Sequence, residues 1–183
     1  MSFFYSKFAL NNLVKNKKFI IPYVLSAIFT IMSFYILSSL AFGDNLDKLP
    51  NGIDATKQVL SFGIIVIALF SVIFLFYTYS FLVKRRVKEF GLYSVLGMTK
   101  KQIAKILVLE TIIIAVTTIV LGIGLGIIFD KLMLLVLLKL FSAGVSFGFS
   151  ITPIAIVFSV LLFGGIYFLL LLYTCLLYTS PSP

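Results

Sequence analysis

The sequence predicts an all-α integral membrane protein with four transmembrane helices, and three observations lead to this fold class. Of the 183 residues, 61% are hydrophobic and 11% are charged, and the mean hydropathy is +1.19. A soluble domain usually has about 45–50% apolar and about 25% charged residues. Apolar runs also exceed the roughly 18 residues that mark a membrane span. Because so short a chain cannot bury this much apolar surface in a core, lipid must be its solvent.

The basic residues lie where they would set the topology of a membrane protein. They gather in two stretches, Lys7–Lys18 and Lys84–Lys105, each of which flanks an apolar run. A nucleic-acid-binding protein would spread such charge over a soluble face, so we expect a lipid bilayer and no nucleic acid as partner. The chain has no histidine for a histidine-based metal site or catalytic triad, and its one cysteine, Cys175, excludes an internal disulfide.

The first predicted span covers residues 19–42. It is too long for the apolar region of a signal peptide and lacks a small-residue cleavage site. Pro22 lies in its first turn, where the missing N–H is tolerated. We expect residues 1–18 to form an amphipathic cytoplasmic segment on the inner leaflet, with a frayed basic tail as the alternative. Its aromatic, aliphatic and basic residues are Phe3, Phe4, Lys7, Phe8, Leu13 and Lys15.

Three further spans follow, over residues 59–83, 106–129 and 153–172. A polar turn region precedes the first of these, and Thr152 and Pro153 suit the N-cap and first position of the last. The stretch 132–141 is apolar but short, and a lysine interrupts it. It favours an interfacial or protruding helix, or a continuation of the third helix, over a fifth span.

The charges between the spans predict the orientation of the chain. The net charges of the segments outside the spans are +4, −1, +6 and +1 in chain order. By the positive-inside rule, the N-terminus and the loop between the second and third spans lie in the cytoplasm. Both ends of the four spans are then cytoplasmic.

That cytoplasmic loop, residues 84–103, is the most informative segment. Gly97 suits the end of a short helix, and Thr99 with Gln102 has the spacing of a capping box that starts another helix. The first helix carries an apolar face formed by Phe90, Tyr93 and Leu96. Such a face either docks on a partner or rests on lipid headgroups beside the basic residues, and the residues alone leave both interpretations open.

Several motifs of this chain together resemble a known family. They are KRR at 84–86, KEFGLY at 88–93, LGMT at 96–99, LET at 109–111, LGIGLG at 121–126 and ALNNL at 9–13. With these motifs the chain is similar to FtsX-like permeases, the membrane subunits of type VII ABC transporters, and among them to the bacitracin-export permeases. Val87 departs from the pattern, where we expect a basic residue. The similarity runs from about Ser2 to Tyr173, so we expect an N-terminal fragment whose permease region covers residues 59–174.

The resemblance implies a mechanism for the cytoplasmic loop. In this family the loop is a coupling helix that is seated in a groove of a separate ABC ATPase subunit and receives its movement. The residues carried over as ATPase contacts are Glu89, Phe90, Gly91, Leu92, Tyr93, Leu96, Gly97 and Met98. For Gly91 and Gly97, a purely backbone role is the alternative.

The resemblance also implies a function in the bacterial plasma membrane. The chain has no phosphate-cradling loop, paired carboxylates or nucleophile with a base, so we expect no enzymatic activity and no cofactor. We expect a permease subunit for antimicrobial-peptide resistance or sensing, with a sensor histidine kinase as a further partner. The alternatives are lipoprotein release, division-associated mechanotransmission, and a small membrane protein that transports nothing.

Two features of the third span and one of the C-terminus complete the predictions. Glu110 is an intramembrane charge, for which structural anchoring is favoured over proton or substrate handling. Gly122 and Gly126 form a G-x-x-x-G pair, for which helix packing is favoured over a hinge. Residues 175–183 resemble a translated sequencing adapter, so we expect a non-native tail rather than a genuine polar C-terminus.

Overall fold

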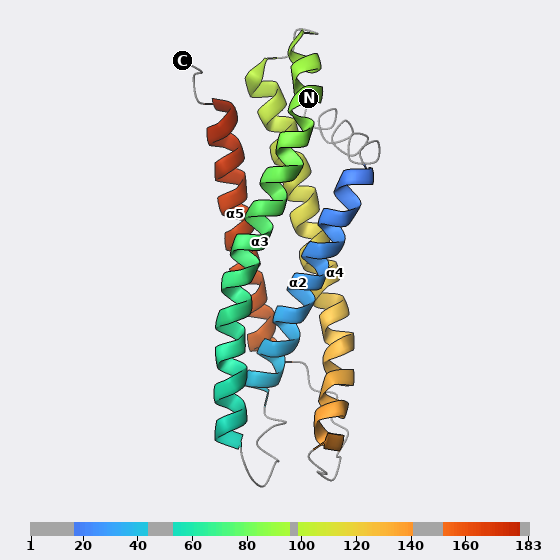
Figure 1. Ribbon diagram of the computed structural model, residues 1–183, viewed down its shortest axis with the longest axis vertical. Coiled ribbons are helices and arrows are strands. Elements are labelled where there is room, and N and C mark those ends of the chain that lie inside the picture. Colours follow the sequence, from blue (N-terminus) through green and yellow to red (C-terminus); the bar gives the residue numbers. More distant parts are fainter. Residues whose placement is uncertain (1–16, 44–52, 96–98, 141–151, 180–183) are drawn as a thin grey trace.

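The computed structural model describes residues 17–43, 53–95, 99–140 and 152–179. They form four helices, which are α2 (Lys17–Phe42), α3 (Ile53–Val95), α4 (Lys100–Leu140) and α5 (Pro153–Thr179). Figure 1 shows these helices side by side in one bundle, with the chain running alternately up and down. The start of α2, the end of α3, the start of α4 and the end of α5 therefore share one end, here called the basic end.

Each of the four helices is long and apolar enough to cross a membrane. The qualifying segments are Lys17–Phe42, Ala55–Arg85, Gln102–Met133 and Pro153–Leu176. The described residues contain no β-strand. The predicted fold class, an all-α membrane protein with four transmembrane helices, is thus confirmed, and the chain is a multi-pass membrane protein.

Two helices extend well beyond the spans expected from the sequence. α3 continues past Val83 through the basic cluster to Val95, and α4 continues past Phe129 to Leu140. Lys, Arg and Glu are good helix formers, so leaving the apolar region does not by itself end a helix. Residues 132–140 continue the third predicted span as part of α4, which was one of the possibilities for this stretch.

The starts of α4 and α5 carry the local contacts that their sequences suggest. The backbone N–H of Thr99 donates to Oε1 of Gln102 at 2.9 Å, and the Thr99 carbonyl accepts from the N–H of Gln102 at 2.9 Å. At α5 the Thr152 carbonyl accepts from the N–H of Ala155 at 3.1 Å, and the helix begins with Pro153, directly after Thr152. The side chains of Thr152 and Ser39 lie 3.2 Å apart, which ties α5 to α2.

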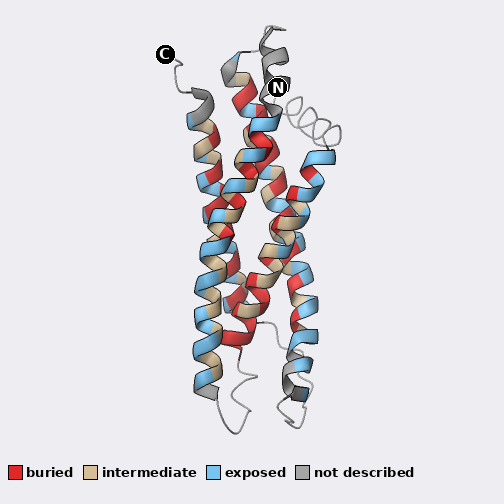
Figure 2. Ribbon diagram, viewed as in Figure 1, coloured by how far each residue is buried: buried red, intermediate tan, exposed pale blue. Residues whose placement is uncertain are grey.

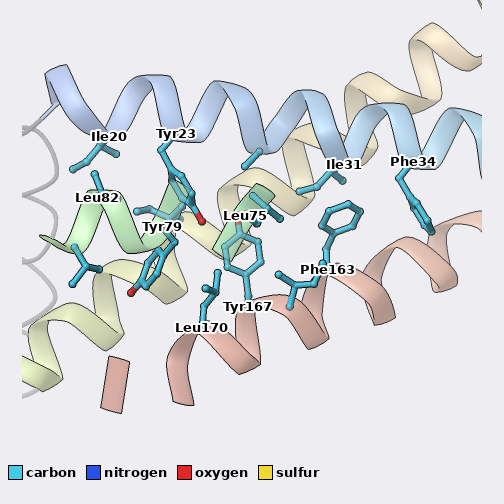
Figure 3. Packing of buried hydrophobic residues seen from close by; sticks show 14 residues of the cluster. Ile20, Tyr23, Ile31, Phe34, Leu75, Tyr79, Leu82, Phe163, Tyr167 and Leu170 are labelled. Carbon is cyan, nitrogen blue, oxygen red and sulfur yellow. The ribbon is translucent and has the colours of Figure 1, made fainter. Parts of the chain in front are cut away.

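The apolar core lies between α2, α3 and α5, with α4 closing one side. Figure 3 shows Tyr23, Ile31 and Phe34 of α2 facing Phe163 and Tyr167 of α5. Half of the α2 span is buried inside the bundle, compared with 11% of the α3 span. Figure 2 accordingly shows the lower half of α3 in pale blue and tan, with buried residues in the part above it. In a membrane, this face of α3 contacts lipid or further protein.

Glycines bring α2 and α4 close together. A Cβ atom added to Gly122 would lie 2.7 Å from Cβ of Ile31, and one added to Gly126 would lie 2.8 Å from Cδ1 of Tyr35. Both distances are shorter than van der Waals contact, so only glycine permits this approach. Gly124, between them, has no atom within 4 Å of such a Cβ.

Candidate coupling site at the basic end

The candidate site is built on the last part of α3. The apolar part of the helix ends at Arg85, and the helix itself ends at Val95, so that ten residues extend beyond it. At 1.5 Å per residue this extension is about 15 Å long. The backbone of Glu89–Tyr93 belongs to it, whereas the predicted contacts Leu96, Gly97 and Met98 lie outside the described residues. α4 then begins at Lys100, so a helix lies on either side of this short connection.

Arg85 connects the root of this extension to α2. Its guanidinium carbon lies 5.3 Å from the ring centroid of Phe19 on α2 and 4.4 Å from that of Phe81 on α3. A guanidinium at such distances is attracted to the ring faces. The α3 extension therefore starts at a side chain that contacts α2.

One and a half turns deeper, Tyr79 connects three helices. Its hydroxyl lies 2.7 Å from Oγ1 of Thr111 on α4 and 2.8 Å from Oγ1 of Thr174 on α5. All three side chains are buried, with exposed fractions of 0–2%. In a lipid-surrounded bundle such hydrogen bonds between helices contribute about 0.6 kcal/mol on average.

The hydrogens available in this cluster restrict how it is bonded. Thr111 Oγ1 also lies 2.8 Å from the Leu107 carbonyl, and Thr174 Oγ1 lies 2.9 Å from the Leu170 carbonyl. A hydroxyl has one hydrogen to donate. Tyr79 can donate to only one threonine. For both contacts to be hydrogen bonds, the other threonine must donate to Tyr79 and cannot donate to the carbonyl of its own helix. The cluster has two such arrangements, and both keep the three helices joined.

A second hydrogen bond between helices lies two turns further along α4. Oγ1 of Thr118 lies 2.8 Å from the hydroxyl of Tyr167 on α5, and it donates to the Ile114 carbonyl at 2.8 Å. Thr111 and Thr118 are seven residues apart and so occupy the same face of α4. The spacing of these two threonines inside an apolar run is a signal of a buried polar face, which the motifs alone did not indicate.

Glu110 lies beside the Tyr79 cluster in the chain and is also buried. Its exposed fraction is 2%, whereas Lys105 near the start of α4 is exposed. Among the described residues, no group of three or more His, Cys, Asp or Glu side chains could hold a metal ion. The polar side chains described above connect α3, α4 and α5 through hydrogen bonds.

Comparison with known proteins assigns the chain to a family. The model of the FtsX-like permease C-terminal family matches residues 61–183. The chain is 32% identical over 154 residues to the uncharacterized ABC transporter permease YvcS of Bacillus subtilis, covering 83% of this chain and 24% of that protein. It is 28% identical over 163 residues to the bacitracin export permease protein BceB of Bacillus subtilis, covering 89% of this chain and 25% of that protein.

A second bacitracin export permease protein BceB, from Halalkalibacterium halodurans, is 29% identical over 163 residues, covering 89% of this chain and 25% of that protein. The chain spans about a quarter of the length of these relatives. The family match, by contrast, covers more than half of the chain. The resemblance stated from the motifs is confirmed: the chain belongs to the FtsX-like permease family.

Proposed function

We propose that this chain is part of the permease subunit of an ABC transporter that protects bacteria from antimicrobial peptides or senses them. Two of its relatives are named bacitracin export permeases. A separate ABC ATPase supplies the energy, and in the sensing case a sensor histidine kinase is a further partner. In this proposal the basic end of the bundle faces the cytoplasm, as the charge distribution predicts.

The observation that carries the proposal is the unbroken course of α3 from Ile53 to Val95. A continuous helix transmits a displacement of one end to the other, because its backbone hydrogen bonds resist bending. An ATPase docked on residues 84–103 would move the α3 extension, and Tyr79 would pass this movement to α4 and α5. The proposed ATPase contacts are Glu89, Phe90, Gly91, Leu92, Tyr93, Leu96, Gly97 and Met98.

The first experiment is to sequence the source locus through and beyond the codon for Thr174. The proposal expects an open reading frame that continues into further spans, beside a gene for an ABC ATPase. It expects the codons for residues 175–183 to be replaced by others. A stop codon directly after Pro183, without a neighbouring ATPase gene, would contradict the proposal.

The second experiment measures binding of that ATPase to the permease. We expect Glu89→Ala and Leu92→Ala to weaken co-purification by more than about tenfold, since truncating one of the few dominant contacts at the centre of an interface costs about 2 kcal/mol or more. Lys139→Ala, at the opposite end of α4, is the matched control and should bind normally. Equal binding by all three variants would exclude residues 84–103 as the docking segment.

A further inference from the structure

A groove at the basic end lies between the first half of α2 and the adjoining part of α3. Its volume is about 430 Å³, and its lining includes Lys18, Phe19, Ser26, Phe74, Phe81 and Arg85. Lys18 and Arg85 are at one extreme of the groove along both helices, whereas Ser26 and Phe74 are at the other. The groove thus runs from a cationic mouth toward the middle of the bundle.

The walls of the groove are apolar even where hydroxyl groups line it. Ser26 Oγ donates to the Tyr23 carbonyl at 2.8 Å, and Thr78 Oγ1 donates to the Phe74 carbonyl at 2.7 Å. Both hydroxyls are therefore engaged with the backbone of their own helices. Next to them, Phe81 and Tyr77 keep 51% and 73% of their surface exposed. Such a wall suits a hydrocarbon chain and offers little to a polar ligand.

The mouth of the groove, in contrast to its apolar walls, is positively charged. Arg85 is held there by its contacts with the rings of Phe19 and Phe81, at 5.3 and 4.4 Å. Its guanidinium has five N–H donors in a geometry that matches phosphate oxygens. Lys18 lines the same mouth from α2 and adds a second positive charge. A groove with two cations at its mouth and apolar walls is complementary to a molecule with an anionic head and an apolar tail.

We propose that this groove binds an anionic phospholipid of the surrounding bilayer. The phosphate lies between Lys18 and Arg85, and one acyl chain follows the wall toward Ser26 and Phe74. Ser26 lies eight residues after Lys18, which corresponds to about 12 Å of helix and is enough for a large part of an acyl chain. In the proposed orientation the groove opens to the cytoplasmic leaflet, where anionic lipids concentrate. The inference needs no ATPase, so it can fail or succeed independently of the proposed function.

The test is native mass spectrometry of the purified full chain with equal amounts of phosphatidylglycerol and phosphatidylcholine that carry the same acyl chains. We expect the wild type to retain phosphatidylglycerol preferentially. Each of Lys18→Gln and Arg85→Gln should lower this preference roughly fivefold, the value for one cation near an anionic surface. Lys139→Gln, which removes a cation from the opposite end, should leave the preference unchanged.

A second variant tests whether an acyl chain occupies the apolar part of the groove, separately from binding of the headgroup. Ser26→Phe fills the groove and should reduce retention of both lipids, whereas Thr117→Phe places the same ring on an exposed position of α4 and should not. Excess inorganic phosphate should leave the bound lipid in place. The proposal is overturned if Lys18→Gln and Arg85→Gln behave like Lys139→Gln, if Ser26→Phe behaves like Thr117→Phe, or if free phosphate displaces the lipid.

Discussion

The hydroxyl of Tyr79 on α3 lies 2.7 Å from Oγ1 of Thr111 on α4. This contact is notable because α3 and α4 otherwise touch each other sparsely, whereas both pack on α2. The bond lies close to the basic end, one and a half turns inside Arg85. It therefore joins the two helices that flank the proposed ATPase-docking segment.

We predict that Tyr79→Phe destabilises the bundle by about 1–2 kcal/mol, because it removes hydrogen bonds to two helices and leaves two buried threonines with only their own carbonyls. In thermal unfolding of the purified chain this corresponds to a Tm lower by about 2–8 °C. Tyr77→Phe is the matched control: Tyr77 lies two residues away and is 73% exposed. Equal Tm values for the two variants would show that the Tyr79 hydroxyl does not stabilise the bundle.

The close approach of α2 and α4 gives a second prediction. Gly122→Ala should destabilise the chain by about 1–3 kcal/mol, the usual cost of overpacking. The added methyl group would lie 2.7 Å from Cβ of Ile31, an atom that cannot move without its backbone. Gly124→Ala meets open space and should be neutral or slightly stabilising, because alanine favours the helix. A Tm for Gly122→Ala that matches that of Gly124→Ala would contradict this packing.

The sequence predicted the four spans because their signal, an apolar run of sufficient length, is local in the chain. It placed a helix end at Gly97 but did not predict that α3 runs unbroken from the second span through the basic cluster to Val95, because good helix formers such as Lys88 and Glu89 carry no stop signal once the lipid-facing part is over. The G-x-x-x-G pair indicated a close contact, but the partner residues Ile31 and Tyr35 depend on how the helices are arranged. For the same reason the sequence could not show that Tyr79 meets threonines of two other helices, although the spacing of Thr111 and Thr118 was a signal of a buried polar face on α4.

The predicted orientation can be tested with single cysteines. In a Cys175→Ser background, Lys84→Cys lies at the basic end and Lys139→Cys at the opposite end, and both lysines are exposed. We expect a membrane-impermeant maleimide to label Lys139→Cys in intact cells, and Lys84→Cys only after the cells are opened. The reverse pattern would place the basic end outside and would refute cytoplasmic docking of an ATPase.

Glu110 provides the last prediction, which separates an anchoring role from a role in proton handling. The side chain is 2% exposed, in a part of α4 that faces other helices. Glutamine keeps the length of glutamate and a carbonyl acceptor, whereas leucine keeps neither. If Glu110 anchors the bundle through polar contacts, Glu110→Gln should change the stability by less than about 1 kcal/mol, and Glu110→Leu should cost about 1–3 kcal/mol.

Thermal unfolding of the full chain measures both variants of Glu110. Thr117→Leu is the control for adding leucine to α4, since Thr117 is exposed. In the proposed transporter, an anchoring role of Glu110 predicts that Glu110→Gln couples ATP hydrolysis to resistance as the wild type does. A glutamine variant that folds normally but loses this coupling would assign the carboxylate itself, through its charge or its proton, to the mechanism.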